Sequence, residues 1–543
     1  MTQNEPGLDF LALGGSGEIG MNLNLYRCDD DWLMIDCGST FARGDEHPGV
    51  DILVPDIAFL EQDGIRPSGI LLTHAHEDHL GALPYLLDEL DTPIFANRFT
   101  LEILRNKLSR AGMLGRASLI EVPIGARFSI GPFAVELLPL AHSIPDMCAA
   151  LICTRYGRVL HTGDWKFDAD PVIALEDPRK QLKEWGDKGV LALVGDSTNA
   201  LSPQSAGSER SVVTQIEDLV QQAPGRVVVA TFASNAARLQ SLGEIAKRTG
   251  RHIAFAGMSF DKIISAAQNT GYLENLPRPI ALDHVASVPP EKLMVIASGA
   301  QGEPNAALAR MAQGTHPVPL DPGDLVILSS RTIPGNETAL GAVLNDLAMM
   351  EVSVASHETA HLHVSGHPGR PDLTEMLELV RPRMVIPVHG EARHLAAHRD
   401  LAASIDGIDS LLQLNGDLIR LAPDGPRKVA SVPSGRLAVD GGHLVPADGR
   451  AINERRKMAS QGVVSIAVFG PVAGPLAAKV IVAGVVPPRE RGQFSRQLAA
   501  AVLEVANRKA DVLWEGEIAR EVLAITMSKT GKSPLILIHV TTR

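Results

Sequence analysis

The sequence contains one dense group of potential metal ligands, directly after the apolar run 69–72. Within six positions it offers three imidazoles and a carboxylate: His74, His76, Asp78 and His79. At the end of a predicted strand, such a group can present nitrogen and oxygen atoms to two cations without requiring a helix. Packing does not explain it, because burying so many unpaired polar groups would be costly. The group therefore predicts a metal centre.

Three further candidate ligands each close an apolar run elsewhere in the chain. They are His142 in PLAHSIPD, Asp164 in HTGDW and His389 in PVHGE. Singly, each could be a hydrogen-bonded structural group, but together with the first group they complete two coordination spheres. We expect His74, His76 and His142 on one cation, Asp78, His79 and His389 on the other, and Asp164 bridging both. Two divalent ions that share a water lower its pKa from about 15.7 toward 7, which is hydrolase chemistry.

Short apolar runs that end in Gly, Asp or His recur through the first 200 residues, as in 32–38 and 158–164. Such runs are typical of buried strands that end in polar loops, where α/β active sites lie. From 208 to 358, helical stretches alternate with strands, which predicts a separate βα unit. Strand-and-His motifs return at 361–367 and 383–391, so we expect the first domain to be interrupted and later resumed.

The chain has 543 residues, which is more than one core usually accommodates. No apolar run of about 18 residues occurs, and the start lacks a signal-like segment. Four cysteines without a CxxC pair give no sign of disulfides. We therefore expect a cytoplasmic protein with no membrane partner. The residues from Ser431 onward carry a net charge of +6 against −19 for the preceding part, which permits contact with a polyanion without requiring it.

The ligand pattern HxHxDH with later His, Asp and His resembles the metallo-β-lactamase superfamily, and Asp36 in MIDCG matches its first-motif aspartate, which supports the ligands from behind. Within that superfamily, 13–22, the GDST run with Asp196, HVSGH (363–367) and VHGE (388–391) resemble the β-CASP nucleases, and most closely the bacterial ribonuclease J family. The similarity runs over roughly residues 8–430. It implies an α/β fold, an αββα metallo-β-lactamase sandwich interrupted by a β-CASP domain and followed by a small α+β C-terminal domain.

The patterns along the chain give the expected domain boundaries, the linker being a stretch rich in Pro, Gly and Asp. We expect the first part of the metallo-β-lactamase domain at 1–207, the β-CASP domain at 208–358 and the second part at 359–425, followed by a linker at 426–460 and the C-terminal domain at 461–543.

By the same resemblance, Asp78, His79, Asp196 and His367 are the expected catalytic residues. His367 matches a histidine that protonates the leaving oxygen, a task that suits an imidazole. The segment 363–367 would hold an RNA phosphate beside the metals, and the loop 231–235 would contact a 5′ monophosphate. The expected substrate-binding residues are Ser234, Asn235, His363, Val364, Ser365, Gly366 and His367.

The resemblance implies a ribonuclease with 5′-to-3′ exonuclease activity on 5′-monophosphorylated RNA and with endonuclease activity. It would act in RNA degradation and in rRNA and mRNA maturation by two-metal hydrolysis. Its partners would be single-stranded RNA, a second copy in a homodimer or a dimer of dimers, and other RNA-degradation proteins. Zn²⁺ is the expected metal, with Mn²⁺ or Mg²⁺ as alternatives, and a further structural ion is expected near Asp51 and Asp440.

Four alternatives stand beside this interpretation. A DNA-directed β-CASP nuclease would share every catalytic residue, and a small-substrate hydrolase such as a lactonase would share the group 74–79. An RNA-binding scaffold with a silent centre would lack ligands, and none is missing here. The glycines of 15–20 satisfy a dinucleotide-binding pattern, but the alternating residues 21–27 predict a hairpin where that fold needs a helix.

Overall fold

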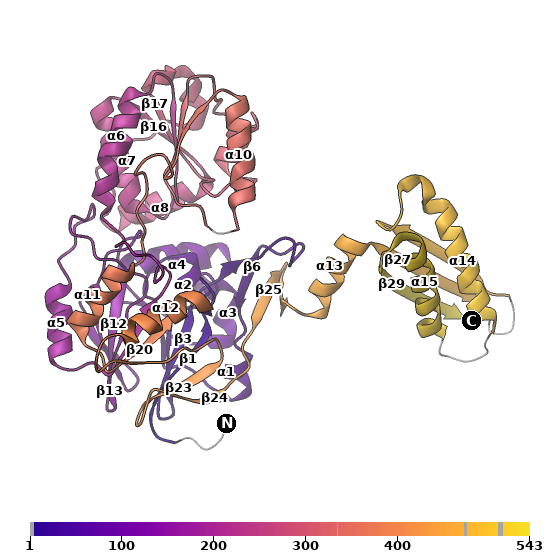
Figure 1. Ribbon diagram of the computed structural model, residues 1–543, viewed down its shortest axis with the longest axis horizontal. Coiled ribbons are helices and arrows are strands. Elements are labelled where there is room, and N and C mark those ends of the chain that lie inside the picture. Colours follow the sequence, from indigo (N-terminus) through magenta and orange to yellow (C-terminus); the bar gives the residue numbers. More distant parts are fainter. Residues whose placement is uncertain (1–4, 334, 472–474, 509–513, 543) are drawn as a thin grey trace. The chain divides into compact units, whose positions relative to one another are not determined.

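The computed structural model describes residues 5–333, 335–471, 475–508 and 514–542 (Figure 1). It forms two compact units, each described here by itself. The first comprises Met1–Thr40 and Pro55–Ser434, and the second comprises Phe41–Val54 and Gly435–Arg543.

Two facing sheets form the larger part of the first unit. In the first sheet the order is β24 (Arg427–Ser431), β23 (Asp417–Ala422), β1 (Leu8–Gly14), β3 (Leu23–Cys28), β4 (Asp31–Ile35), β7 (Gly69–Leu71), β8 (Ile94–Ala96) and β9 (Leu119–Glu121). In the second it is β10 (Arg127–Ile130), β11 (Phe133–Pro139), β12 (Cys148–Thr154), β13 (Gly157–His161), β14 (Ala192–Asp196), β20 (Met384–Val388) and β22 (Asp409–Ser410). Residues such as Phe10, Ile35 and Val194 from both sheets form one buried core.

Helices cover the outer faces of this sandwich. On the second sheet, α5 (Arg179–Asp187), α11 (Arg370–Val380) and α12 (Ala392–Ala403) enclose a core that contains Trp165, Trp185 and Met376. On the first sheet, α1 (Ala58–Gln62), α2 (Glu77–Leu80), α3 (Leu83–Leu90) and α4 (Arg98–Arg110) lie among the parallel strands β4, β7, β8 and β9. Since the inner face packs on the other sheet, these helices occupy the outer one. The expected αββα sandwich is confirmed.

A third sheet lies entirely between β14 and β20 in the sequence. Its parallel strands are β16 (His252–Ala256), β17 (Leu293–Ala297), β15 (Val227–Ala230), β18 (Leu325–Leu328) and β19 (Ser353–Ala355). They alternate with α6 (Val213–Gln222), α7 (Ala236–Thr249), α8 (Met258–Asn269), α9 (Ala307–Ala312) and α10 (Glu337–Met349). A separate core fills this layer. Because β14 and β20 are parallel neighbours, the chain leaves the sandwich at the carboxyl end of β14 and returns through α11 to the amino end of β20.

The second unit contains two small sheets. The first is formed by β26 (His443–Pro446), β25 (Arg436–Asp440), β6 (Ile52–Pro55) and β5 (Thr40–Phe41), with α13 (Arg450–Gln461) following in the chain. The second is formed by β28 (Ala477–Ala483), β27 (Val463–Gly470) and β29 (Leu535–Thr542), with α14 (Arg491–Arg508) and α15 (Trp514–Thr530).

The stretch 426–460, which we expected to be a linker, contains three strands and a helix. Its glycines and prolines mark the ends of short elements: Gly441 turns the chain between β25 and β26, and Gly449 precedes α13. The composition that suggested irregular chain thus reflects closely spaced turns.

The glycine pattern at 15–20 also has a clear structural outcome. No helix follows it; β3 does, and β3 pairs antiparallel with β1, Leu8 opposite Cys28. The predicted hairpin is confirmed. Among the described helices, none combines the length and apolar character needed to cross a bilayer.

Candidate metal centre

The predicted ligands lie where strands of both sheets end. His74 follows β7, and Asp78 and His79 belong to α2, which begins immediately afterward. His142 follows β11, Asp164 follows β13 and His389 follows β20. Gly38 lets α2 approach closely, because a Cβ there would lie 1.7 Å from the carbonyl oxygen of Asp78.

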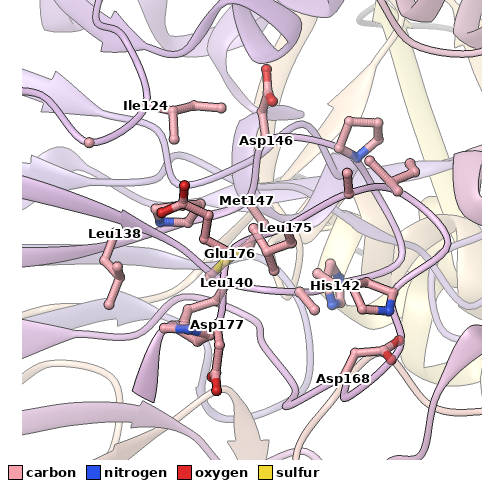
Figure 2. Close-up of a pocket in the computed structure, with 18 of the residues that line it drawn as sticks. Ile124, Leu138, Leu140, His142, Asp146, Met147, Asp168, Leu175, Glu176 and Asp177 are labelled. Carbon is pink, nitrogen blue, oxygen red and sulfur yellow. The ribbon is translucent and has the colours of Figure 1, made fainter. Parts of the chain in front are cut away.

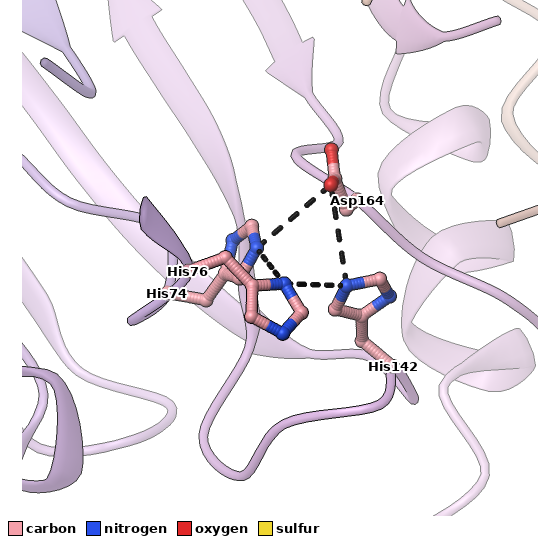
Figure 3. Close-up of side chains that lie close together, drawn as sticks. All are labelled: His74, His76, His142 and Asp164. Atoms are coloured by element: carbon pink, nitrogen blue, oxygen red, sulfur yellow. Dashed lines mark hydrogen bonds and ion pairs between the residues drawn. The ribbon is translucent and has the colours of Figure 1, made fainter. Parts of the chain in front are cut away.

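Four of these side chains converge on one point, as Figure 3 shows: His74, His76, His142 and Asp164. Their ligand atoms all lie within 4.8 Å of one another. His76 Nδ1 lies 3.1 Å from both His74 Nε2 and His142 Nε2. Buried nitrogens that face one another at this distance fit a cation between them, and imidazole with carboxylate is a donor set that Zn²⁺ and Mn²⁺ accept.

A second cluster shares the carboxylate of Asp164 with the first. Asp78, His79, Asp164 and His389 also place ligand atoms within 4.8 Å of one another. Asp164 Oδ2 lies 3.1 Å from His79 Nε2 and 3.3 Å from His389 Nε2. The structure therefore brings together all seven predicted ligands, with Asp164 between the two groups. Both clusters fit a divalent cation.

Electrostatics divide the two clusters. Burial lowers the pKa of His74 well below its ordinary value, and the neighbouring His79 lowers it further. Burial and the nearby His367 lower the pKa of His142 to about 4. These imidazoles are neutral, which is the form that binds metal. In the second cluster burial opposes ionisation of Asp164, yet His389 and His79 hold its pKa well below the usual range.

Asp36 orients one histidine of each cluster. Its carboxylate accepts hydrogen bonds from His79 Nδ1 at 2.8 Å, from the Thr73 amide at 2.8 Å and from Thr73 Oγ1 at 2.8 Å. Because Thr73 Oγ1 donates to Asp36, it accepts from His74 Nδ1, 3.0 Å away. Both rings thus turn Nε2 toward the metal positions. The supporting role expected of Asp36 has this physical basis.

Two residues of the centre adopt left-handed backbone, with φ of 63° at Asp36 and 53° at His389. Residues other than glycine rarely adopt this backbone conformation, and such strained residues are concentrated at functional sites. It turns each side chain sharply inward just after its strand ends. No sequence signal announces this conformation, because neither residue is a glycine.

His367 and Asp196 form a third group beside the clusters. His367 Nδ1 lies 2.8 Å from Asp196 Oδ2, and His367 remains partly exposed. Burial opposes protonation, but Asp196 and Asp164 raise the pKa of His367 to about 9. Asp196 therefore accepts the hydrogen bond from Nδ1–H, and Nε2 carries the second proton of the imidazolium.

The segment 363–367 lies against the metal ligands and is held by a residue that sequence analysis missed. Asn199 Nδ2 donates to Ser365 Oγ at 2.6 Å and to the His367 carbonyl at 3.2 Å. The Gly366 carbonyl accepts from His142 Nδ1 at 2.7 Å, so this backbone oxygen orients a metal ligand. The only available signal for Asn199 was its position directly after GDST.

The other predicted substrate residues have distinct environments. Val364 is buried, while His363 Nδ1 is buried with no hydrogen-bond partner among the described residues. Burial and the nearby Arg238 lower the pKa of His363 to about 3, so the ring is neutral. Asn235 caps α7, its Oδ1 accepting from the Arg238 amide at 2.9 Å, and Ser234 precedes it. The amide of Asn235 is thus already engaged.

A cavity of about 620 Å³ opens beside the first cluster (Figure 2). Its wall includes His142, with Leu140 and Met147 of the sandwich and Glu209 and Tyr272 of the inserted layer. Several carboxylates line it, so a cation or a neutral group would enter more readily than an anion.

The further structural ion expected near Asp51 and Asp440 finds no support. The Asp440 carboxylate pairs with the Arg455 guanidinium, whose Nη1 and Nη2 lie at 2.9 and 2.5 Å. Among the described residues, neither Asp51 nor Asp440 belongs to a ligand cluster. Arg455 already supplies the counter-charge that the ion would have provided.

Replacing Asp36 tests the supporting role of its carboxylate. In Asp36→Asn an amide group faces donors that need an acceptor, so we expect Zn²⁺ affinity to fall about 10–100-fold. Competition with a chelator measures the affinity. Asp31→Asn, on the exposed start of β4, is the matched control and should bind as the wild type does. Unchanged affinity in Asp36→Asn would contradict this role.

Three family models match the chain. The metallo-β-lactamase superfamily matches residues 22–219, the ribonuclease J β-CASP domain matches 224–347, and the Zn-dependent metallo-hydrolase RNA specificity domain matches 351–412. The order of the three matches follows the interrupted sandwich.

Curated relatives match over the whole chain. Ribonuclease J of Sinorhizobium meliloti is 39% identical over 100% of this chain and 98% of its own. Ribonuclease J of Thermus thermophilus is 35% identical over 98% and 94%. A crystal structure of a protein of unknown function from Enterococcus faecalis covers 76% of this chain and 100% of its own, with a TM-score of 0.53 and 17% identity, which shows the fold alone. On the metal clusters and these full-length matches together, the chain belongs to the ribonuclease J family of metal-dependent ribonucleases.

Proposed function

We propose that the protein removes nucleotides from the 5′ end of monophosphorylated, single-stranded RNA and also cuts RNA internally. One observation carries the proposal: two clusters of metal-ligand side chains share Asp164 and adjoin the pair of His367 and Asp196. This is the set of groups that phosphodiester hydrolysis needs. The resemblance of 363–367 and 231–235 to RNA-contacting segments of the family adds support.

The proposed chemistry assigns a task to each group of the chain. Two cations, held by the seven clustered ligands, would polarise the phosphoryl group and lower the pKa of a bound water. His367 Nε2 gives its proton to the departing O3′ oxygen as the P–O3′ bond breaks, while Asp196 holds Nδ1–H. Asn199 and Ser365 keep the segment that carries His367 in place.

Recognition of a 5′ monophosphate would fall to the loop before α7. Ser234 lies at the N-terminal end of this 14-residue helix, where backbone amides favour an anion. The unpartnered Nδ1 of His363 offers a second contact. With one nucleotide between this loop and the metals, repeated cleavage would release mononucleotides.

We further propose that the enzyme works in the cytoplasm, in RNA degradation and in rRNA and mRNA maturation. The four cysteines are all free, as in proteins of reducing compartments. Zn²⁺ is the metal we expect, with Mn²⁺ or Mg²⁺ as alternatives, because a His/Asp donor set accepts each. Association with other RNA-degradation proteins stays a prediction.

Cleavage assays with labelled RNA test the proposed substrate. Two RNAs, one with a 5′ monophosphate and one with a 5′ triphosphate, and a DNA strand of the same sequence are each mixed with enzyme in Zn²⁺, Mn²⁺ or Mg²⁺. We expect immediate release of mononucleotides from the monophosphorylated RNA, release from the triphosphorylated RNA only after an internal cut, and no product from His76→Ala, which lacks a metal ligand. Equal cleavage of DNA would favour the DNA-directed nuclease, and no cleavage in any metal would defeat the proposal.

The proton-donor role of His367 has its own test. We expect His367→Ala to lower kcat about 100–10,000-fold, the usual range for loss of a general acid, with metal content unchanged. Metal analysis beside kinetics separates this outcome from that of His76→Ala, in which metal is lost. His361→Ala, on the same segment but exposed, is the control. Substantial activity in His367→Ala would show that another group donates the proton to the leaving oxygen.

We also propose that the C-terminal sheet mediates homodimerisation. Its helices cover one face, where Phe494 and Ile518 are buried. Register places Ile481, Ser465 and Leu537 in one row on the opposite face, with Phe469 on the same face four residues further along β27. Ile481 is 58% exposed, Leu537 48% and Phe469 46%. A second copy could cover these apolar side chains with its own equivalent face.

Light scattering after gel filtration tests this surface. A charge in its middle would be buried without a partner in the dimer, so we expect Ile481→Glu to be monomeric at concentrations where the wild type is dimeric. Met258→Glu, at an exposed methionine of the inserted layer, is the control and should stay dimeric. A dimeric Ile481→Glu would place the contact on another surface.

A further inference from the structure

A buried charge pair lies where the chain enters the inserted layer. Glu209, in the short helix η2 (Glu209–Val212), is 3% exposed, and Arg238, in the first turn of α7, is fully buried. Although burial opposes ionisation, Arg238 and Lys166 hold the pKa of Glu209 below its ordinary value. Because the desolvation of two charges is costly, such a pair adds little to the stability of the fold, which points to a role in positioning other residues.

The guanidinium of Arg238 joins three separate segments. Nε and Nη2 donate to Glu209 Oε2 at 3.1 and 2.9 Å. Nη1 donates to the hydroxyl of Ser329, at the end of β18, and to the carbonyl of Leu362 at 3.0 Å. Ser329 Oγ also donates to the Leu362 carbonyl, at 2.9 Å. Leu362 immediately precedes His363, so this hub fixes the segment that leads to His367.

The same pair fixes the loop before α7. Asn235 Nδ2 donates to Glu209 Oε1 at 3.4 Å, and Asn235 Oδ1 accepts the backbone amide of Arg238. Arg238 therefore holds Asn235 directly through its backbone amide and indirectly through Glu209, and Ser234 immediately precedes Asn235 in the chain. The proposed monophosphate loop and the 363–367 segment share one anchor.

A neighbouring buried lysine ties this anchor to the metal centre. Lys166 lies two residues beyond Asp164, and its Nζ donates to the Gly207 carbonyl at 2.9 Å, two residues before Glu209. Lys166 is 1% exposed, so its bond to Gly207 is shielded from water. Hydrogen bonds and short stretches of chain thus connect the shared metal ligand through Lys166 and Glu209 to Arg238 and Asn235.

We propose that Arg238, held by Glu209, is a positioning residue that sets the spacing between the 5′-monophosphate loop and the metal centre, and so gives the enzyme its preference for monophosphorylated ends. The inference rests on the proposed exonuclease function. An arginine suits the task because its planar fork donates in several fixed directions at once, which the single ammonium of a lysine does not do. Internal cutting does not use the loop, and His367 keeps its position without Arg238 because Asn199 and Asp196 hold it directly.

Arg238→Met tests the inference against a matched pair on the same helix. Arg248 also forms two bonds with a glutamate, to Glu217 at 2.7 and 2.8 Å, but it lies half exposed near the other end of α7. Each variant is assayed on 5′-monophosphorylated RNA, 5′-hydroxyl RNA and circular RNA of one sequence. For Arg238→Met we expect KM on the monophosphorylated RNA to rise at least tenfold and the preference over 5′-hydroxyl RNA to fall equally. We expect its kcat on circular RNA to stay within twofold, and Arg248→Met to match the wild type throughout.

Two results would overturn the inference: an unchanged monophosphate preference in Arg238→Met, or an equal loss of activity on circular RNA, which would mark a purely structural role. If Arg238→Met does not fold, Ser329→Ala replaces it, since it removes only the hydroxyl that bridges Arg238 and Leu362. A threefold loss of preference in Ser329→Ala would support the inference, and no loss would refute it. A wild-type enzyme without any monophosphate preference would refute the proposed function itself, and this inference with it.

Discussion

The carboxylate of Asp164 is the point on which the centre depends. It is buried, and it lies against imidazoles of both clusters at 3.1 to 4.0 Å. An ionised carboxylate in such a place is stable only with positive charge around it. Although burial opposes protonation, Asp164 raises the pKa values of His79 and His389, which favours positive charge on these two rings, and cations would supply that charge in the loaded enzyme. Competition between protons and metal for the same lone pairs is therefore built into the site.

The arrangement of the strands meets this requirement by bringing distant residues together at one edge. Asp164 and His389 follow strands that lie in the same sheet, with β14 between them, and His74 follows a strand of the facing sheet. The inserted layer begins and ends beside this edge, since Asn199, just after β14, donates to Ser365, where the chain returns from the layer. A substrate bound by the inserted layer thus reaches the metals without a long connecting arm.

Much of this could be predicted from the sequence. The density of ligands in 74–79 indicated a metal centre, and apolar runs ending in His142, Asp164 and His389 indicated strands that converge, because strand ends gather active-site residues. The changing rhythm of strands and helices predicted that the first domain is interrupted, and the resemblance to the metallo-β-lactamase superfamily implied the αββα sandwich. Alternation at 21–27 correctly predicted a hairpin in place of a dinucleotide-binding turn.

Other features carried no local signal. Asn199 and Ser365 lie 166 residues apart, and the ion pair of Arg238 and Glu209 spans 29 residues, so only the folded chain shows these contacts. The left-handed backbone of His389 is a conformation that only a few per cent of non-glycine residues adopt, so the sequence does not announce it. At 426–460 the glycines and prolines pointed to irregular chain, whereas they separate short strands. Composition registers turns without revealing what lies between them.

The second unit borrows residues 41–54 from the beginning of the chain. Val50 and Leu53 of this borrowed hairpin pack with Ala438 and Ile452 in one small core. During synthesis the hairpin emerges from the ribosome roughly 400 residues before its partners, and at about 5–20 residues per second it waits some tens of seconds for them. A fragment beginning after the hairpin would leave the apolar side chains of Ala438 and Ile452 exposed to water. The hairpin and the C-terminal residues of this unit therefore complete their folding together, and removing either one exposes apolar surface on the other.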